Sequence, residues 1–300
     1  MASMRDIKRR RSSIQGTQQI TKAMKLVSTV KLQRARANAE RSKDYFTSMY
    51  DTVNSILKRV GHIEHRYLVS GASRKKAVIV ITSNRGLAGG YNSNVIKLVT
   101  RNPQWEKEDL VIYTVGNKGR EAFVRYGYEV KDGYNDVVES PAYGDALALS
   151  EELLQAFAAG EVGEIYLAYT AFKNTVSHVP TLLRLLPIER TEGNEEDAGK
   201  ASAIMNFEPE DEEALNLIIP KYVTSLIYGA LMEAVASENG ARMQAMDNAT
   251  SNAEEMIQDL ALKYNRARQG SITQQLTEII AGAEALPGEE ISPQTAGRKS

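Results

Sequence analysis

The residues of this chain that could support chemistry include a glycine-rich loop. The loop reads SNRGLAGG over residues 83–90 and lies between an apolar run and a short helical pattern, a place where proteins often bind phosphate. Its glycines do not form GxGxxG, and the lysine of a P-loop is absent. Gly116 and Asn117, which follow the next apolar run, include no carboxylate that could hold a ribose. Two interpretations stay open: a nucleotide site, or a tight turn whose glycines permit close packing.

Side chains that could bind metal or act in catalysis are sparse. His62 and His65 are three residues apart in a turn-rich stretch, His178 is distant from both in sequence, and Glu64 is the nearest carboxylate. This spacing does not match a metal-ligand pattern. The sequence has no cysteine, which excludes disulfides, thiolate metal sites and thiol catalysis. We therefore expect no catalytic residue, no metal and no cofactor.

The charges are strongly segregated along the chain. Residues 1–41 carry eleven Lys or Arg against Asp6 and Glu40, whereas residues 189–213 carry ten acids against two basic residues. The basic run at 8–11 is either a solvated helix face or a nucleic-acid patch, and it has no interleaved aromatic residues for binding single strands. Such polarity predicts that the two regions meet different partners.

The C-terminal stretch, from about Pro209 to Leu286, predicts one very long helix. After Pro220 its isolated glycines each cost a helix only about 1 kcal/mol. Apolar and small residues follow one another at steps of three or four, which is the seam of a helix packed along another helix. At 1.5 Å per residue, roughly 65 residues would be about 100 Å long. The seam consists of Met246, Ala249, Ala253, Ile257, Leu260, Tyr264, Ala267 and Ser271.

The N-terminal stretch, Met4 to about Val60, predicts the partner helix. It has no proline and a single glycine, Gly16. Its stripe is thin and partly polar, which makes it weak as a homodimeric zipper. We therefore expect the two terminal helices to pair with each other in antiparallel orientation. The stripe consists of Ile7, Ile14, Thr21, Met24, Ser28 and Ala35, continued by Tyr45, Met49, Val53, Ile56 and Val60.

The middle of the chain predicts an α/β layer with a mainly parallel sheet. Continuous apolar runs at 77–82, 110–115 and 164–169 are typical of buried parallel strands, and helical patterns at 91–99, 117–126 and 144–159 alternate with them. Residues 166–176 and 181–186 can form a hairpin onto this sheet. The acidic stretch 189–203 predicts a linker.

The overall composition is ordinary: 42% hydrophobic and 25% charged residues, with a formal net charge of -1 over 300 residues. No run of about 18 apolar residues exists, and the basic N-terminus lacks the apolar core of a signal peptide. We therefore expect no membrane insertion and a cytosolic topology. The predicted domains are an N-terminal helix (1–60), an α/β domain (75–190), a C-terminal helix (207–286) that pairs with the first, and a flexible tail (287–300).

Several motifs then resemble the gamma subunit of F-type ATP synthases. They are ITKAMKLVSTVKLQRAR at 20–36, NRARQGSITQQLTEIIAGAEAL at 265–286, the glycine loop, and VPTLLRLLP at 179–187. The resemblance extends from about residue 4 to 286. It implies a long antiparallel coiled coil with an inserted Rossmann-like α/β domain.

The resemblance also implies a function, that of a non-catalytic rotor shaft present in one copy per complex. Such a shaft couples ion-driven rotation of a c ring to conformational change and ATP synthesis or hydrolysis in a ring of alpha and beta subunits. Its partners would be the alpha, beta and epsilon subunits and the c ring, at the cytoplasmic face of a bacterial plasma membrane. Nucleic acid would not be a partner, since the basic helix would face acidic segments of beta.

Residue by residue, the resemblance places contacts with the beta subunit at Arg268, Gln269, Thr273 and Met24. It places the foot that meets epsilon and the c ring at Phe207 and Glu208. An apolar tip suited to turning in a sleeve is formed by Leu276, Ile279, Ile280 and Ala283.

Some positions depart from the family pattern. Gln275 stands where many members have Glu, and Asn84 and Ala88 replace an acidic residue and a cysteine common in the glycine loop. Two other functions stay open: a nucleotide-binding α/β enzyme on a helical stalk, and a coiled-coil tether.

Overall fold

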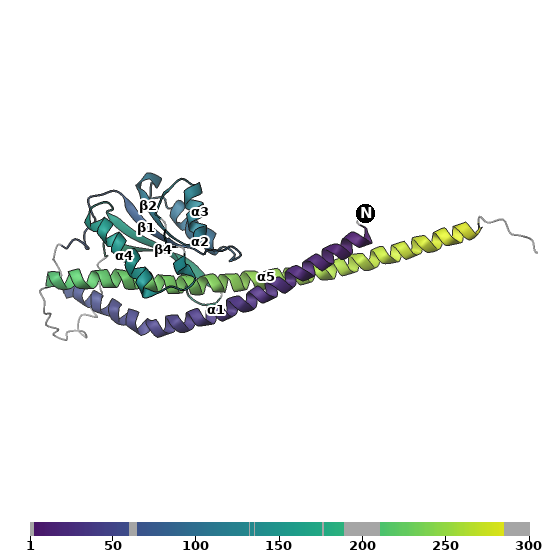
Figure 1. Cartoon of the computed structure of the whole chain (residues 1–300), viewed down its shortest axis with the longest axis horizontal. Coiled ribbons are helices and arrows are strands. Elements are labelled where there is room, and N and C mark those ends of the chain that lie inside the picture. The colour runs from purple at the N-terminus through teal and green to yellow at the C-terminus, as the bar shows by residue number, and fades with distance from the viewer. Residues whose placement is uncertain are drawn as a thin grey trace, which may run out of the picture. The chain divides into compact units, whose positions relative to one another are not determined.

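The computed structural model describes residues 3–59, 65–131, 133–134, 136–175, 177–188 and 211–284. An α/β domain lies between two long terminal helices in the sequence (Figure 1). In chain order the elements are α1 (Met4–Arg59), β1 (Lys76–Ile81), α2 (Tyr91–Thr100), η1 (Lys107–Asp109), β2 (Leu110–Val115), α3 (Asn117–Arg125), β3 (Glu129–Lys131), η2 (Asp136–Val138), α4 (Tyr143–Ala158), β4 (Glu164–Phe172), β5 (His178–Leu186) and α5 (Asp211–Glu284).

The described elements form two compact units. The first comprises Met1–Thr21 with Ala249–Ser300, and the second comprises Lys22–Asn248. Helices α1 and α5 each contribute to both units, whereas the sheet belongs to the second.

The sheet has five strands in the order β3-β2-β1-β4-β5. Strands β1 to β4 run parallel, with Ile79 opposite Tyr113 of β2 and Leu167 of β4. Strand β5 is antiparallel to β4 and forms the hairpin expected from the sequence. Strands β2 and β3 lie on one side of β1, and β4 and β5 lie on the other. The chain therefore crosses from one side of β1 to the other between β3 and β4.

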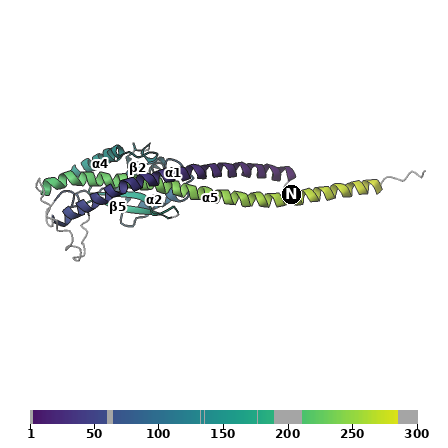
Figure 2. The ribbon, with the colours of Figure 1, turned by 90° about the horizontal axis from the view of Figure 1, so that it is seen from below.

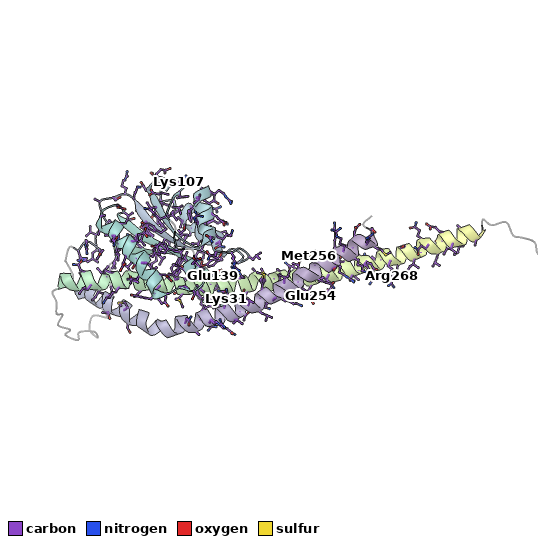
Figure 3. The ribbon with its side chains drawn as sticks, in the orientation of Figure 1. Lys31, Lys107, Glu139, Glu254, Met256 and Arg268 are labelled. Atoms are coloured by element: carbon purple, nitrogen blue, oxygen red, sulfur yellow. The ribbon has the colours of Figure 1, made fainter. Side chains whose placement is uncertain are left out.

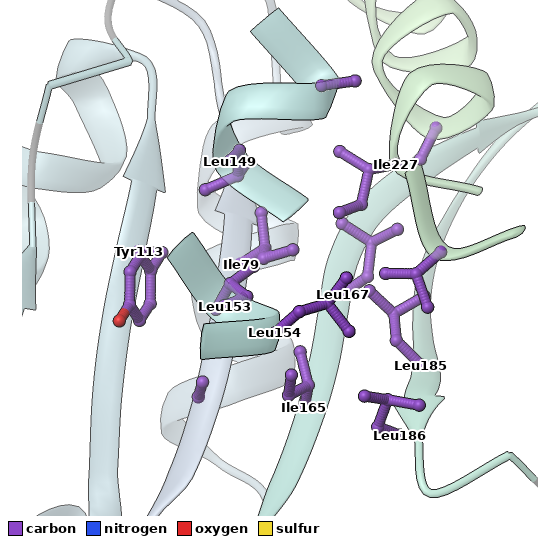
Figure 4. Packing of buried hydrophobic residues seen from close by; sticks show 14 of the residues in the cluster. Ile79, Tyr113, Leu149, Leu153, Leu154, Ile165, Leu167, Leu185, Leu186 and Ile227 are labelled. Atoms are coloured by element: carbon purple, nitrogen blue, oxygen red, sulfur yellow. The ribbon is translucent and has the colours of Figure 1, made fainter. Parts of the chain in front are cut away.

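Side chains of β1 alternate between two apolar layers. Val78 and Val80 face α2 and α3, where they pack with Val95 and Phe123. Ile79 and Ile81 face the opposite layer, which α4 and α5 cover with Leu149, Leu153 and Ile227 (Figure 4). Because both faces are covered, the central strands are apolar throughout, as buried parallel strands require.

The strands and helices of the α/β domain lie within a few residues of the predicted ranges. β2 coincides with the predicted 110–115, and α2, α3 and α4 differ by one residue at their ends. Strand β3 was not predicted. It has three residues, of which Val130 alone is apolar, so no alternation is long enough to indicate a strand.

The two long helices pair in antiparallel orientation, which confirms the fold expected from periodicity. In the first unit the Thr21 and Thr250 hydroxyls are 2.7 Å apart, and Arg11 lies over the ring of Tyr264 at 5.8 Å. In the second unit Lys25 contacts Asp247 at 2.6 Å. Later residues of α1 thus meet earlier residues of α5, and the two helices lie side by side in both views (Figure 1, Figure 2).

The burial of the two predicted stripes follows the helical period. Every residue of the predicted α5 seam from Met246 to Ser271 is buried or half-buried, and most residues between them are exposed. On α1 the positions Ile7, Thr21 and Ser28 are buried at heptad spacing. The seam is therefore partly polar, as predicted. Ile56 and Tyr45, also predicted for this stripe, have side chains outside the described set.

Helix α5 also contains a stretch that passes, by length and composition, for a membrane span, and half of that stretch is buried inside the protein. The criterion of about 18 consecutive apolar residues misses this stretch, because charged residues such as Lys221 interrupt it. Its apolar face is the one that covers the sheet. Packing against the α/β core therefore accounts for this composition.

Candidate functional site: the glycine loop and the exposed helix surfaces

The glycine loop follows β1 and is bonded to the start of α3. The backbone N–H of Asn117 donates to the Asn84 side chain at 3.0 Å, and that of Lys118 donates to the Ser83 carbonyl at 3.0 Å. The N–H of Gly119 donates to the Thr82 hydroxyl at 2.8 Å. These are the groups that a helix would offer to a phosphate. Because the chain itself satisfies them, these N–H groups are not available to a phosphate at the start of α3.

Two glycines at this junction are required by close packing. Gly116 has φ 100°, and a Cβ there would lie 2.2 Å from the Thr82 carbonyl oxygen. A Cβ on Gly119 would lie 2.8 Å from the Thr82 hydroxyl that accepts its N–H. This close packing belongs to the junction between β2 and α3, whereas in the glycine loop itself a Cβ on Gly86 would meet nothing within 4 Å and one on Gly89 would meet only Ala245 at 3.9 Å.

Helix α5 holds the loop from the other side. The Arg242 guanidinium donates to the carbonyls of Arg85 and Gly86 at 3.5 and 3.3 Å, and pairs with Glu238 at 2.7 Å. This ion pair is only 14% and 12% exposed. Burial raises the pKa of the Glu238 carboxyl, against the opposing effect of Arg242.

Further polar contacts fasten α5 to the sheet. The Tyr91 hydroxyl donates to the Ala234 carbonyl at 3.3 Å, and the Ser237 hydroxyl donates to the Thr170 carbonyl at 3.0 Å. The Phe172 N–H donates to the Glu233 carboxylate at 3.2 Å. Burial raises the pKa of Glu233. Together with the apolar core, these bonds fasten the part of α5 that lies in the second unit, up to Asn248, to the α/β domain.

A groove of about 700 Å³ opens between α1, α5, the glycine loop and residues 138–141. Met24, predicted to contact a beta subunit, lines it and is half-buried. Lys31 and Glu139 also line the groove (Figure 3). Leu87, at the tip of the loop, has φ 65° and is 63% exposed. The groove therefore combines apolar and charged groups that are open to a partner.

The other predicted beta-contact residues lie in the first unit, on exposed positions of α5. Arg268 and Gln269 are exposed, and Arg268 extends from the helix (Figure 3). Thr273 is exposed too, but its hydroxyl donates to the Gln269 carbonyl at 3.0 Å. Thr273 can therefore offer a partner only an acceptor.

The predicted apolar tip is exposed throughout. Leu276, Ile279 and Ile280 are 56%, 68% and 59% exposed, and Ala283 is exposed as well. Every described side chain of α5 from Ile272 onward is exposed. In both views this end of α5 (yellow) continues past the N-terminus of α1 (Figure 1, Figure 2). Three large aliphatic side chains in water, on a helix without a neighbour in the described chain, indicate a surface for another protein.

The remaining predicted residues are of two kinds. Phe207, Glu208, His62 and the tail 287–300 lie outside the described residues. His65 is 3% exposed beside Tyr67, and His178 packs over Gly240, where a Cβ would lie 2.4 Å from its Nε2. Within the described ranges, no three His, Asp or Glu side chains are grouped so as to hold a metal.

This arrangement defines a helical-stalk protein, whose paired terminal helices present the surfaces open to partners. Comparison with known proteins gives the family. Residues 3–286 match the family described as ATP synthase. The ATP synthase gamma chain of Lachnoclostridium phytofermentans is 64% identical, over 95% of this chain and 100% of its own. The sodium-ion-specific ATP synthase gamma chain of Acetobacterium woodii is 40% identical, over 95% and 99%.

Solved structures share the fold. A chain of the Euglena gracilis mitochondrial ATP synthase, determined by cryo-EM with OSCP, F1 and c-ring, matches with a TM-score of 0.65 and 18% identity, over 96% of this chain and 98% of its own. A chain from the central stalk and c-ring of the Tetrahymena thermophila mitochondrial enzyme gives a TM-score of 0.58 at 24% identity, over 77% and 99%. The chain belongs to the ATP synthase family, as a gamma chain of the central stalk, and is a subunit of that complex.

Sequence reasoning missed the residues that clamp α5 to the domain. Arg242, Tyr91 and Glu233 have no motif, because their partners are backbone groups far away in sequence. The one available signal was an acid and a base four residues apart, Glu238 and Arg242, in an otherwise apolar stretch. That pattern is common on solvated helices and so carries little information.

Two glycine substitutions should have opposite effects on stability. Gly116→Ala forces a Cβ against a backbone carbonyl at positive φ, and we expect it to cost about 1–3 kcal/mol. Gly16→Ala, in α1 with open space around it, should gain about 0.5–1 kcal/mol from lower backbone entropy. Thermal unfolding of the purified chain measures both. A neutral Gly116→Ala would contradict the packing described for the junction between β2 and α3.

The raised pKa of Glu233 predicts a pH-dependent stability. Its folded state binds a proton more readily than the unfolded chain, so stability is lost as pH rises through the ordinary carboxyl range toward the raised value. Glu233→Gln keeps an acceptor for the Phe172 N–H and removes this charge. We expect a higher Tm than wild type near pH 8 and no difference below about pH 4. The exposed Glu254→Gln is the matched control and should change stability by less than about 0.5 kcal/mol at either pH. A Glu233→Gln gain that is independent of pH would contradict this account.

Proposed function

We propose that this chain is the rotor shaft that couples ion-driven turning of a c ring to ATP synthesis and hydrolysis in a ring of alpha and beta subunits. The observation that carries the proposal is the bare apolar tip of α5, with Leu276, Ile279 and Ile280 more than half exposed. An apolar tip without fixed polar partners suits a sleeve in which it turns. The shaft has no catalytic role in this proposal, and its effect on catalysis is mechanical.

Coupling requires that torque applied to the α/β domain reach the helices. The clamp described above supports this step, because Arg242, Tyr91 and Ser237 fix the middle of α5 to the loop and the sheet. The hydroxyls of Ser150 in α4 and Thr224 in α5 add a buried contact at 2.6 Å. Rotation of the domain would therefore carry α5 with it.

The shaft would act on the catalytic sites through differential contact. Contact with the shaft can shift a partner subunit between two conformations only if the free energy of that contact differs between them. Arg268, Gln269, Thr273 and Met24 are proposed to make these contacts with beta subunits. One side of the helix pair differs from another, so each beta subunit would meet different side chains at a given angle.

The remaining partners and the location follow from the same proposal. Phe207 and Glu208 are assigned to the foot that meets epsilon and the c ring. The complex would lie at the cytoplasmic face of a bacterial plasma membrane, with one copy of this chain and no insertion of the chain itself. The names of the relatives support an ATP synthase, and the cryo-EM neighbours include F1 and c-ring.

The contacts can be tested with the double variant Arg268→Gln/Thr273→Val in the reconstituted complex. Removing a charged donor and an acceptor should lower coupled ATP synthesis about tenfold if the lost contact supplied about 1.4 kcal/mol. The same substitution at an exposed arginine of α3, Arg125→Gln, is the control and should leave synthesis unchanged. Unchanged synthesis in the double variant would refute the assigned contacts.

The subunits that copurify with this chain distinguish the rotor function from the two alternatives, a coiled-coil tether and a nucleotide-binding enzyme. The rotor proposal requires alpha and beta subunits to copurify with this chain in threefold excess over it. A homodimer without them would support a tether. Saturable binding of ATP or NAD by the chain alone, with no copurifying subunits, would support a nucleotide-binding enzyme.

A further inference from the structure

A cavity of about 300 Å³ lies at the carboxyl end of the sheet. The loop after β1, the end of β4, the start of β5 and α5 line it. β1 stands between β2 and β4, and the chain changes direction across the sheet at this position. Open α/β sheets bind ligands in the crevice at this switch point. Helix α5 fills most of that crevice here, with the Ala245 side chain 3.9 Å from the position of a Cβ on Gly89.

The N-terminus of α2 borders this cavity. Gly90 is its N-cap, no side chain caps it, and its first turn has no acidic residue. Gly89 and Asn94 line the cavity beside it, and Gly89 has φ 57°. A helix N-terminus of this kind carries partial positive charge and favours an anion.

Independent evidence for a ligand comes from a buried hydroxyl that also lines the cavity. Thr170 is 2% exposed, and within the described chain its Oγ1 has no hydrogen-bond partner. The Thr170 carbonyl is occupied by the Ser237 hydroxyl, but the Thr170 hydroxyl itself is unused. The Nε2 of His178, another lining residue, is also buried without a partner among described residues. Buried polar atoms ordinarily have a partner, so these groups point to a bound molecule.

The lining selects the chemistry of that molecule. Of the described residues around the cavity, none is Asp, Glu, Lys or Arg, and three offer side-chain amides: Asn94, Gln244 and Asn248. Hydroxyl and amide donors at a helix N-terminus, without a carboxylate, suit a small anion rather than a cation. We propose that the cavity binds a small tetrahedral oxyanion of the phosphate class, with Thr170 and the α2 N-terminus as its main donors.

The test is calorimetric titration of inorganic phosphate into the purified full chain at constant ionic strength. We expect one saturable site, and we expect Thr170→Val, which is nearly isosteric, to weaken it about fivefold because one hydrogen bond is lost. Thr170→Ser keeps the hydroxyl and should retain binding. Thr100→Val is the matched control, since that hydroxyl donates to the Ile96 carbonyl at the far end of α2 and should not affect binding.

Three results would overturn the proposal. Absence of saturable binding across the millimolar range would mean that the cavity holds water only, and equal affinity in wild type and Thr170→Val would mean that phosphate binds away from this cavity. ATP binding more tightly than phosphate would replace the small-anion site with a nucleotide site. If Thr170→Val does not fold, Asn94→Ala provides the second variant, and undiminished phosphate binding in it would count against the site.

Discussion

The structure of the second unit depends on the burial of α5 against the sheet. Leu215, Ile219, Val223, Ile227 and Leu231 recur every four residues, and all of them lie in the core shared with β1, β4 and α4. At about 2 kcal/mol for each buried aliphatic side chain, this stripe contributes on the order of 10 kcal/mol. That equals the net stability of a typical domain. The core of the α/β domain is therefore incomplete without this part of α5, from Leu215 to Ala234.

The same packing explains why an α/β fold can serve a mechanical role. A parallel sheet creates a crevice at the carboxyl ends of its strands, and this crevice is where such folds usually place a ligand. In this chain α5 occupies most of it, and the loop that could cradle phosphate is bonded to α3 and to Arg242. Because the crevice holds a helix of the same chain, a fold that usually binds a ligand there instead fixes that helix in place.

Much of this could be predicted from the sequence, and the limits have physical reasons. Continuous apolar runs located β1, β2 and β4, and steps of three and four located both helices and their antiparallel pairing. Apolar runs and the helical spacing of apolar residues involve only neighbouring positions, so they can be recognised in a single sequence. The role of the glycine loop was not decided from the sequence, because the partners of its polar groups, the Asn117 N–H for the Asn84 side chain and Arg242 for the Gly86 carbonyl, depend on how distant elements pack. The clamp residues could not be found, because their partners are backbone atoms of distant elements.

The end of α5 has a consequence for how forces pass through the first unit. Up to Ser271 the helix is half-buried against α1, and a pair of helices resists bending and twisting far better than one helix does. Beyond that point α5 continues alone among the described residues, so it can bear sideways pressure but little torsion. The exposed aliphatic side chains Leu276, Ile279 and Ile280 offer no directional bonds that would have to break on turning. Under the proposed function, the last three turns would centre the rotating part without driving it.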